Sequence, residues 1–130
     1  MNKDYYERKG KYEKSNYENI KGELKAVLGK AYNGKYNILL VHDPKGFGKY
    51  AEYGYDLILA GHIHGGVIRI PFVNKGVLSP EVKLFPKYDA GIYKKGKSIM
   101  CVNKGLGYGT IPFRLFNRPE IVCVEIGKSV

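Results

Sequence analysis

Residues 56–66, DLILAGHIHGG, decide the fold, because a short apolar run ends there in two histidines that are flanked by glycines. Residues 37–44, NILLVHDP, form a second apolar run, which ends in the only other histidine of the chain, His42. Continuous apolar runs of this length, bounded by Gly or Pro, are typical of strands that are covered on both faces. The two runs predict neighbouring strands that each deliver a histidine at the C-terminal end.

The segments around these two strands indicate an α/β chain. Residues 45–54, KGFGKYAEYG, predict a short helix or turn, so strand, helix and strand alternate as in a βαβ unit. Residues 17–35 predict an amphipathic helix, because apolar residues recur there at three- and four-residue steps before the stop at Asn33-Gly34. Further strands are expected within 65–72, 98–107 and 120–127. We expect one partial domain of α/β (α+β) class over residues 18–127, after a basic, disordered lead-in at residues 1–17.

Composition bounds the class of protein. The 130 residues carry a net charge of +10, from 22 basic and 12 acidic side chains. The lysines are spread along the whole chain, which favours a solvated surface over a specific nucleic-acid interface. No apolar run is long enough for a transmembrane segment, and the N-terminus shows no secretory signal, so we expect a cytoplasmic protein.

The three histidines form a candidate metal site. Neutral imidazole is a good ligand for Zn, Mn, Fe and Ni. A His-x-His pair directs both rings into one cleft only if the backbone turns sharply, and Gly61, Gly65 and Gly66 permit that turn. Asp43, followed by Pro44, fixes a tight exit after His42. The spacing alone leaves two alternatives open, a metal site or hydrogen-bonded structural histidines.

Three stretches together resemble a known family. GHIHGG behind an apolar strand, the upstream LLVHDP and the tail NKGLG…IPFRLFNRPEI resemble the C-terminal part of the calcineurin-like metallophosphoesterases. The match looks like the bacterial branch related to UDP-2,3-diacylglucosamine hydrolases, and it covers about residues 36–126. The resemblance implies the C-terminal half of a two-sheet sandwich with flanking helices. It also implies metal-dependent hydrolysis of a phosphoester by a phosphatase or phosphodiesterase.

The resemblance also implies roles for individual residues. In the family two divalent metals (Mn, Fe, Zn or Ni) share a bridging hydroxide that attacks phosphorus. His42 and His62 would bind one metal, and His64 would bind the other.

Other residues near these histidines would have supporting roles. Asp43 would orient the loop or an imidazole, and Gly61, Gly65 and Gly66 would shape the loop. Arg69 and Arg114 are candidate contacts to an anionic substrate, although solvent exposure is the simpler expectation for each.

Several motifs of the family are missing from this sequence. The family order is Asp-x-His, Gly-Asp, Gly-Asn-His, His and Gly-His-x-His, and only the last two occur here. Three neutral ligands cannot hold a dinuclear centre, and no histidine is left as a catalytic acid, so no catalytic residue is assigned. We expect an incomplete domain, which self-associates or needs a complementing N-terminal half. The alternative is an inactive metal- or partner-binding remnant, or one half of a split enzyme.

Overall fold

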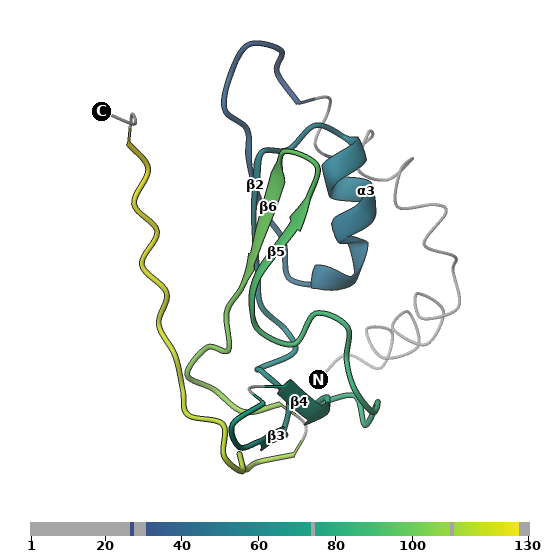
Figure 1. Ribbon diagram of the computed structural model, residues 1–130, viewed down its shortest axis with the longest axis vertical. Helices are drawn as coiled ribbons and strands as arrows, with labels where there is room; N and C mark the ends of the chain where they lie inside the picture. Colours follow the sequence, from purple (N-terminus) through teal and green to yellow (C-terminus); the bar gives the residue numbers. More distant parts are fainter. Residues whose placement is uncertain (1–26, 28–30, 74, 110, 128–130) are drawn as a thin grey trace.

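The computed structural model describes Val27 and residues 31–73, 75–109 and 111–127, which form two sheets (Figure 1). The larger sheet has the strand order β1-β2-β6-β5, and the smaller sheet pairs β3 with β4. A 3₁₀ turn, η1, and one helix, α3, connect β1 to β2. The elements are β1 (Ile38–Leu40), η1 (Pro44–Gly46), α3 (Phe47–Glu52), β2 (Leu57–Ala60), β3 (Ile68–Ile70), β4 (Lys75–Leu78), β5 (Gly91–Lys95) and β6 (Ser98–Val102). The mixed content confirms the α/β class expected from the sequence.

Strands β1 and β2 form the predicted βαβ unit. They pair in parallel, with Ile38 opposite Leu57, and η1 and α3 make the crossover. Asp43 starts the crossover, because its Oδ1 accepts a hydrogen bond from the backbone N–H of Lys45 at 2.9 Å. Pro44 follows at the first position of the turn, where its missing N–H costs nothing.

Three parallel strands end at one edge of the larger sheet. β2 pairs in parallel with β6, and β5 returns antiparallel to β6. The chain leaves β1 toward His42, β2 toward His62, and β6 toward Asn103. Backbone hydrogen bonds hold these exits together, from Gly61 N–H to His42 O at 3.2 Å and from Asn103 N–H to Ala60 O at 2.9 Å. Loops at this edge are therefore brought side by side, as expected for an α/β sheet.

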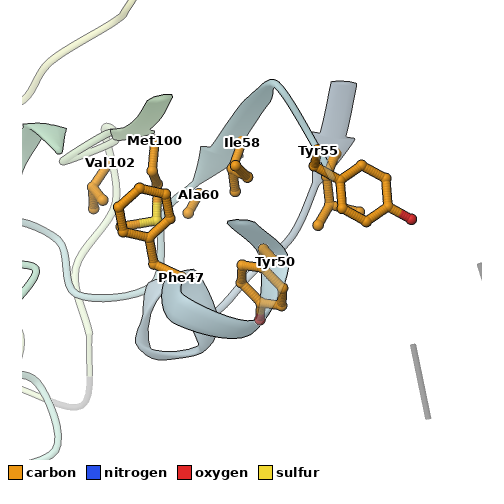
Figure 2. Close-up of a cluster of buried hydrophobic side chains, with 8 residues drawn as sticks. Phe47, Tyr50, Tyr55, Ile58, Ala60, Met100 and Val102 are labelled. Atoms are coloured by element: carbon orange, nitrogen blue, oxygen red, sulfur yellow. The ribbon is translucent and has the colours of Figure 1, made fainter. Parts of the chain in front are cut away.

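The core lies between α3 and one face of this sheet. Figure 2 shows Phe47 and Tyr50 of α3 facing side chains of β2 and β6. The buried cluster consists of Leu39, Phe47, Tyr50, Tyr55, Ile58, Ala60, Met100 and Val102. Burial of these apolar side chains is the main stabilising contribution to the fold.

On the other face of the sheet, several apolar side chains of the described residues are exposed. In β1 only Leu39 is buried, at 4% exposed, whereas its neighbours Ile38 and Leu40 are 44% and 74% exposed. Ile92 on β5 is exposed on the same side as Leu40, through the register Leu40–Leu59–Cys101–Ile92. The expectation of cover on both faces is therefore wrong for β1. The reason is that α3 covers one face, and successive side chains of a strand point to opposite faces.

The prediction of a strand within 120–127 is also wrong. This segment is extended but pairs with no strand among the described residues, and Figure 1 shows it running apart from the larger sheet. A pocket of about 620 Å³ lies at this place, lined by Tyr36, Leu57 and residues 124–127. The segment has strand-like composition, but the described part of the chain offers no strand that pairs with it.

The remaining predicted elements have mixed outcomes. The strands expected within 65–72 and 98–107 correspond to β3 and β6. The lead-in at 1–17 and most of the helix predicted at 17–35 lie outside the described residues, although Gly34 at the predicted stop does form a turn with φ 75°. No helix in the described part of the chain is long and apolar enough to cross a membrane.

Candidate functional site

The loop after β2, residues 61–66, carries two histidines in an unusual backbone conformation. His62 and His64 have positive φ values of 68° and 53°, followed by Gly65 at 72° and Gly66 at 85°. Positive φ is uncommon for residues other than glycine and carries strain. Such strain clusters at functional sites, so the loop is the first place to look for chemistry.

Two of the three loop glycines are required by close packing as well as by φ. A Cβ on Gly66 would lie 2.9 Å from the carbonyl oxygen of Leu78, and one on Gly65 would lie 2.5 Å from Cγ of Lys104. Gly61 differs, because a Cβ there would meet nothing closer than Asn103 O at 4.0 Å. Gly65 and Gly66 thus allow the histidine loop to sit against β4 and against the loop after β6.

Buried side chains hold the carbonyl groups of this loop. Arg69 on β3 donates from Nη1 to Gly65 O at 2.7 Å. Asn117 donates from Nδ2 to His64 O at 2.7 Å and also to Gly66 O. Arg69 and Asn117 are each only 4% exposed. Hydrogen bonds therefore hold the carbonyl groups of His64, Gly65 and Gly66, and with them the backbone that carries the His64 ring.

Arg69 is buried, which contradicts the expectation of solvent exposure for that residue, whereas its contact with an anionic substrate stays a prediction. Its guanidinium pairs with Asp89 at 3.1 Å. Asp89 in turn accepts hydrogen bonds from Gly76 N–H at 2.6 Å and from the Tyr93 hydroxyl at 2.8 Å. Burial, together with the hydrogen bond to Asp89 and its negative charge, raises the pKa of Tyr93 to about 12. Arg69 and Asp89 are thus structural supports of the loop.

The rings of His42 and His62 lie against each other, and a carboxylate contacts His62. Their ring centroids are 4.5 Å apart, and His62 Nε2 is 2.8 Å from Glu81 Oε1. Lys45 and Lys83 place their ammonium groups 2.7 Å and 3.0 Å from Glu81 Oε2. Burial alone would raise the pKa of Glu81, but the hydrogen bonds from Lys45, His62 and Lys83 outweigh it and lower the pKa to about 2.

His64 lies beside Arg114. Arg114 Nη2 is 3.5 Å from His64 Nδ1, and it donates to the carbonyl oxygens of Lys104 at 2.9 Å and Gly105 at 3.1 Å. Burial first, and then the positive charge of Arg114, lower the pKa of His64. His64 is therefore held as the neutral imidazole, the form that can bind a metal or accept a proton.

The histidines do not by themselves fit a metal centre. No group of three or more His, Cys, Asp or Glu side chains placed to hold a metal ion occurs among residues 31–73, 75–109 and 111–127. The contact at Glu81 gives one physical reason. An ionised carboxylate only accepts, so its hydrogen bond with His62 puts the proton on Nε2 and leaves only Nδ1 of His62 with a lone pair for a metal. The ammonium groups of Lys45 and Lys83 also repel a dication at this point.

Two residues of this site were missed by the analysis of the sequence. Glu81 is a single carboxylate in a segment that was expected to be mostly loop, and its contact with His62 spans 19 residues of sequence. Asn117 lies in the tail that carries the family resemblance, but its bond to His64 spans 53 residues. No local spacing could have indicated either contact.

Comparison with known proteins identifies relatives of this chain. Over 107 residues it is 35% identical to the uncharacterised metallophosphoesterase YkuE of Bacillus subtilis, a match that covers 82% of this chain and 36% of that protein. An uncharacterised metallophosphoesterase of Aquifex aeolicus is 41% identical over 106 residues, covering 79% of this chain and 38% of the relative. The phosphodiesterase YaeI of Escherichia coli is 33% identical over 91 residues, covering 68% and 32%.

The chain thus spans about a third of the length of the curated relatives it matches. No protein-family model and no solved structure matches it. The narrower resemblance to UDP-2,3-diacylglucosamine hydrolases stays a prediction. The agreement of several relatives over most of the chain confirms the broader assignment, and the chain belongs to the metallophosphoesterase family.

Proposed function

We propose that the edge of the sheet that carries His42, His62 and His64 is the phosphoester-hydrolysing site of this chain. The observation that supports it best is the convergence of all three histidines of the sequence at the ends of two neighbouring parallel strands. The name of the Escherichia coli relative, a phosphodiesterase, agrees with this reaction class.

The surroundings of the histidines suit an anionic substrate. Lys45, Lys83 and Arg114 place positive charge on both sides of the histidine loop. A phosphoryl group carries negative charge, which these cations would attract and orient. Asp43 contributes through the turn that it caps, since that turn directs the chain away from His42.

We infer that the site is completed by ligands that this sequence does not contain. His42 and His62 would serve one metal and His64 the other, but the family's Asp-x-His, Gly-Asp and Gly-Asn-His motifs are absent from these 130 residues. In their absence Glu81 occupies Nε2 of His62. A polypeptide that carries those motifs would displace Glu81 and supply the remaining donors.

The open face of the larger sheet supports the same inference. Leu40 and Ile92 are 74% and 69% exposed there. A pocket separates the segment 124–127 from Leu57 on β2. Apolar surface of this kind is normally covered by another layer. The occupant would be a polypeptide with the sequence that the relatives have and this chain lacks. The second candidate function, an inactive partner-binding remnant, is favoured by the hydrogen bond that occupies Nε2 of His62.

The experiment is Mn²⁺-dependent hydrolysis of bis-p-nitrophenyl phosphate by the purified chain, beside His62→Ala, His64→Ala and the control Lys94→Gln. Lys94 lies exposed on β5, away from the histidines. We expect hydrolysis that both histidine variants abolish and the control keeps when the missing motifs are supplied on a second polypeptide. Hydrolysis that survives both histidine substitutions would refute the site. Full hydrolysis by the lone chain would refute the inference of missing ligands.

A further inference from the structure

A pocket on the Arg114 side of His64 has the composition of a binding site for the organic part of a substrate. We propose that this pocket binds the aromatic group of a phosphate ester, an aryl or nucleoside phosphate, and that two arginines hold its charge. The inference rests on the proposed function for the position of the reaction, but binding in the pocket can be measured without hydrolysis.

The pocket has the size and lining of a small-molecule site. Its volume is about 500 Å³, within the range of about 300–1,000 Å³ that is typical of ligand pockets. Three of its lining residues are aromatic, namely Tyr108, Phe113 and Phe116. They are 61%, 53% and 67% exposed, so their rings are available to a ligand. Planar aromatic groups stack on such rings with little dependence on their exact structure.

Two lining residues connect the pocket to the histidine loop. Arg114 lies 3.5 Å from His64 Nδ1, and Asn117 donates to the backbone carbonyl of His64. Any group bound between the aromatic rings and these two residues would therefore have His64 as its neighbour. A substrate whose aromatic part occupies the pocket would present its phosphate toward the histidines.

The charge of the pocket is positive, and no carboxylate of the described residues balances it. In the described part of the chain, the carboxylates that form salt bridges pair with other cations, and none lies within ion-pair distance of Arg114 or Arg118. Nη1 of Arg114 is buried and has no hydrogen-bond partner among the described residues. Arg69 shows the contrast, since its buried charge is met by Asp89. Nε and Nη2 of Arg114 already donate to backbone carbonyls, so Arg114 contributes positive charge, whereas the exposed Arg118 can donate two hydrogen bonds to one phosphate.

The test is isothermal titration of the full chain with adenosine 5′-monophosphate, ribose 5-phosphate, adenosine and hexyl phosphate, all in EDTA. We expect the nucleotide to bind about tenfold more tightly than each of the other three compounds, because only it offers both the ring and the phosphate. EDTA removes divalent metals, so the result does not depend on the hydrolytic site being complete.

Two variants locate the binding. Phe116→Leu should weaken nucleotide binding about tenfold and leave ribose 5-phosphate unchanged, because it removes a stacking ring. Arg118→Gln should weaken the binding of all three phosphate compounds. It is preferred to a change at Arg114, which also holds the loop at 104–107. Lys94→Gln, an equal change of charge on β5, should have no effect. Thermal unfolding of each variant is the control that tests whether its fold is intact.

Three results would overturn the proposal. They are equal affinity for nucleotide and ribose 5-phosphate, equal affinity for nucleotide and hexyl phosphate, and absence of nucleotide binding. None of the three bears on hydrolysis at the histidines, which the assay with bis-p-nitrophenyl phosphate measures separately.

Discussion

At the scale of single residues, Gly66 and Gly96 both have left-handed backbone conformations but lie in different surroundings. Their φ values are 85° and 57°. A Cβ on Gly66 would meet Leu78 O at 2.9 Å, whereas one on Gly96 would meet nothing within 4 Å. The pair therefore separates the cost of left-handed φ from the cost of the close approach that shapes the histidine loop.

Gly96→Ala should lower the free energy of unfolding by about 1 kcal/mol, the cost of a left-handed residue with a Cβ. Gly66→Ala should cost at least about 2 kcal/mol more, because the backbone of β4 must move as well. Urea unfolding of both variants measures the difference. Equal losses would show that the packing of Gly66 against Leu78 does not matter.

Sequence patterns could predict the meeting of the histidines, because the ends of parallel strands share one edge of a sheet. His42 and His62 follow two such strands, and their rings are 4.5 Å apart. The patterns could not predict that Arg69 would be buried or that Glu81 would bind His62. The burial of Arg69 and the contact of Glu81 with His62 both depend on long-range pairing and packing between residues that are distant in the sequence.

At the scale of elements, β1 has one covered face and one open face. Leu39→Ala should lower the free energy of unfolding by about 2–4 kcal/mol, because it opens a cavity among the core side chains around β1. Leu40→Ala removes the same atoms from a side chain that is 74% exposed, so it should cost less than about 1 kcal/mol. Similar losses for the two variants in urea unfolding would mean that the open face is covered.

The hairpin of β5 and β6 carries Tyr93, whose hydroxyl donates to Asp89. The pKa of Tyr93 in the folded chain is raised from its ordinary value of 10.0 to about 12. A raised pKa means that the stabilisation is fully present below pH 10 and is lost as the pH rises through about 12. Absorbance of the phenolate, compared with Tyr93→Phe, should show one tyrosine that ionises near pH 12 and a parallel fall in stability. Ionisation of Tyr93 at pH 10 would contradict the hydrogen bond to Asp89.

Local patterns predicted the βαβ unit and β6, since each is specified by an apolar run and the turn residues beside it. They failed for 120–127, where strand-like composition meets no pairing partner among the described residues. Composition states what a segment favours, whereas a ladder also needs a neighbour at the right distance. Ile38 and Leu40 on β1 are exposed for a different reason, because they point to the face of the sheet opposite α3.

At the scale of the whole molecule, apolar side chains are exposed on the open face of the larger sheet. An open edge strand and an apolar face favour association with another chain. We predict that the lone chain self-associates in sedimentation velocity at micromolar concentration, and that Leu40→Lys shifts it toward the monomer. The control Lys94→Gln should not change the distribution. A monomer at every concentration tested would contradict this expectation.

The central claim is that this chain carries the histidines of a metallophosphoesterase site but not its full set of ligands. The most direct test is to measure how many Mn²⁺ ions the purified chain binds, by isothermal titration, beside His62→Ala. The account predicts at most one weakly bound Mn²⁺ per chain, which His62→Ala abolishes. Two tightly bound Mn²⁺ ions per chain would contradict it, because the three histidines would then suffice for a dinuclear centre.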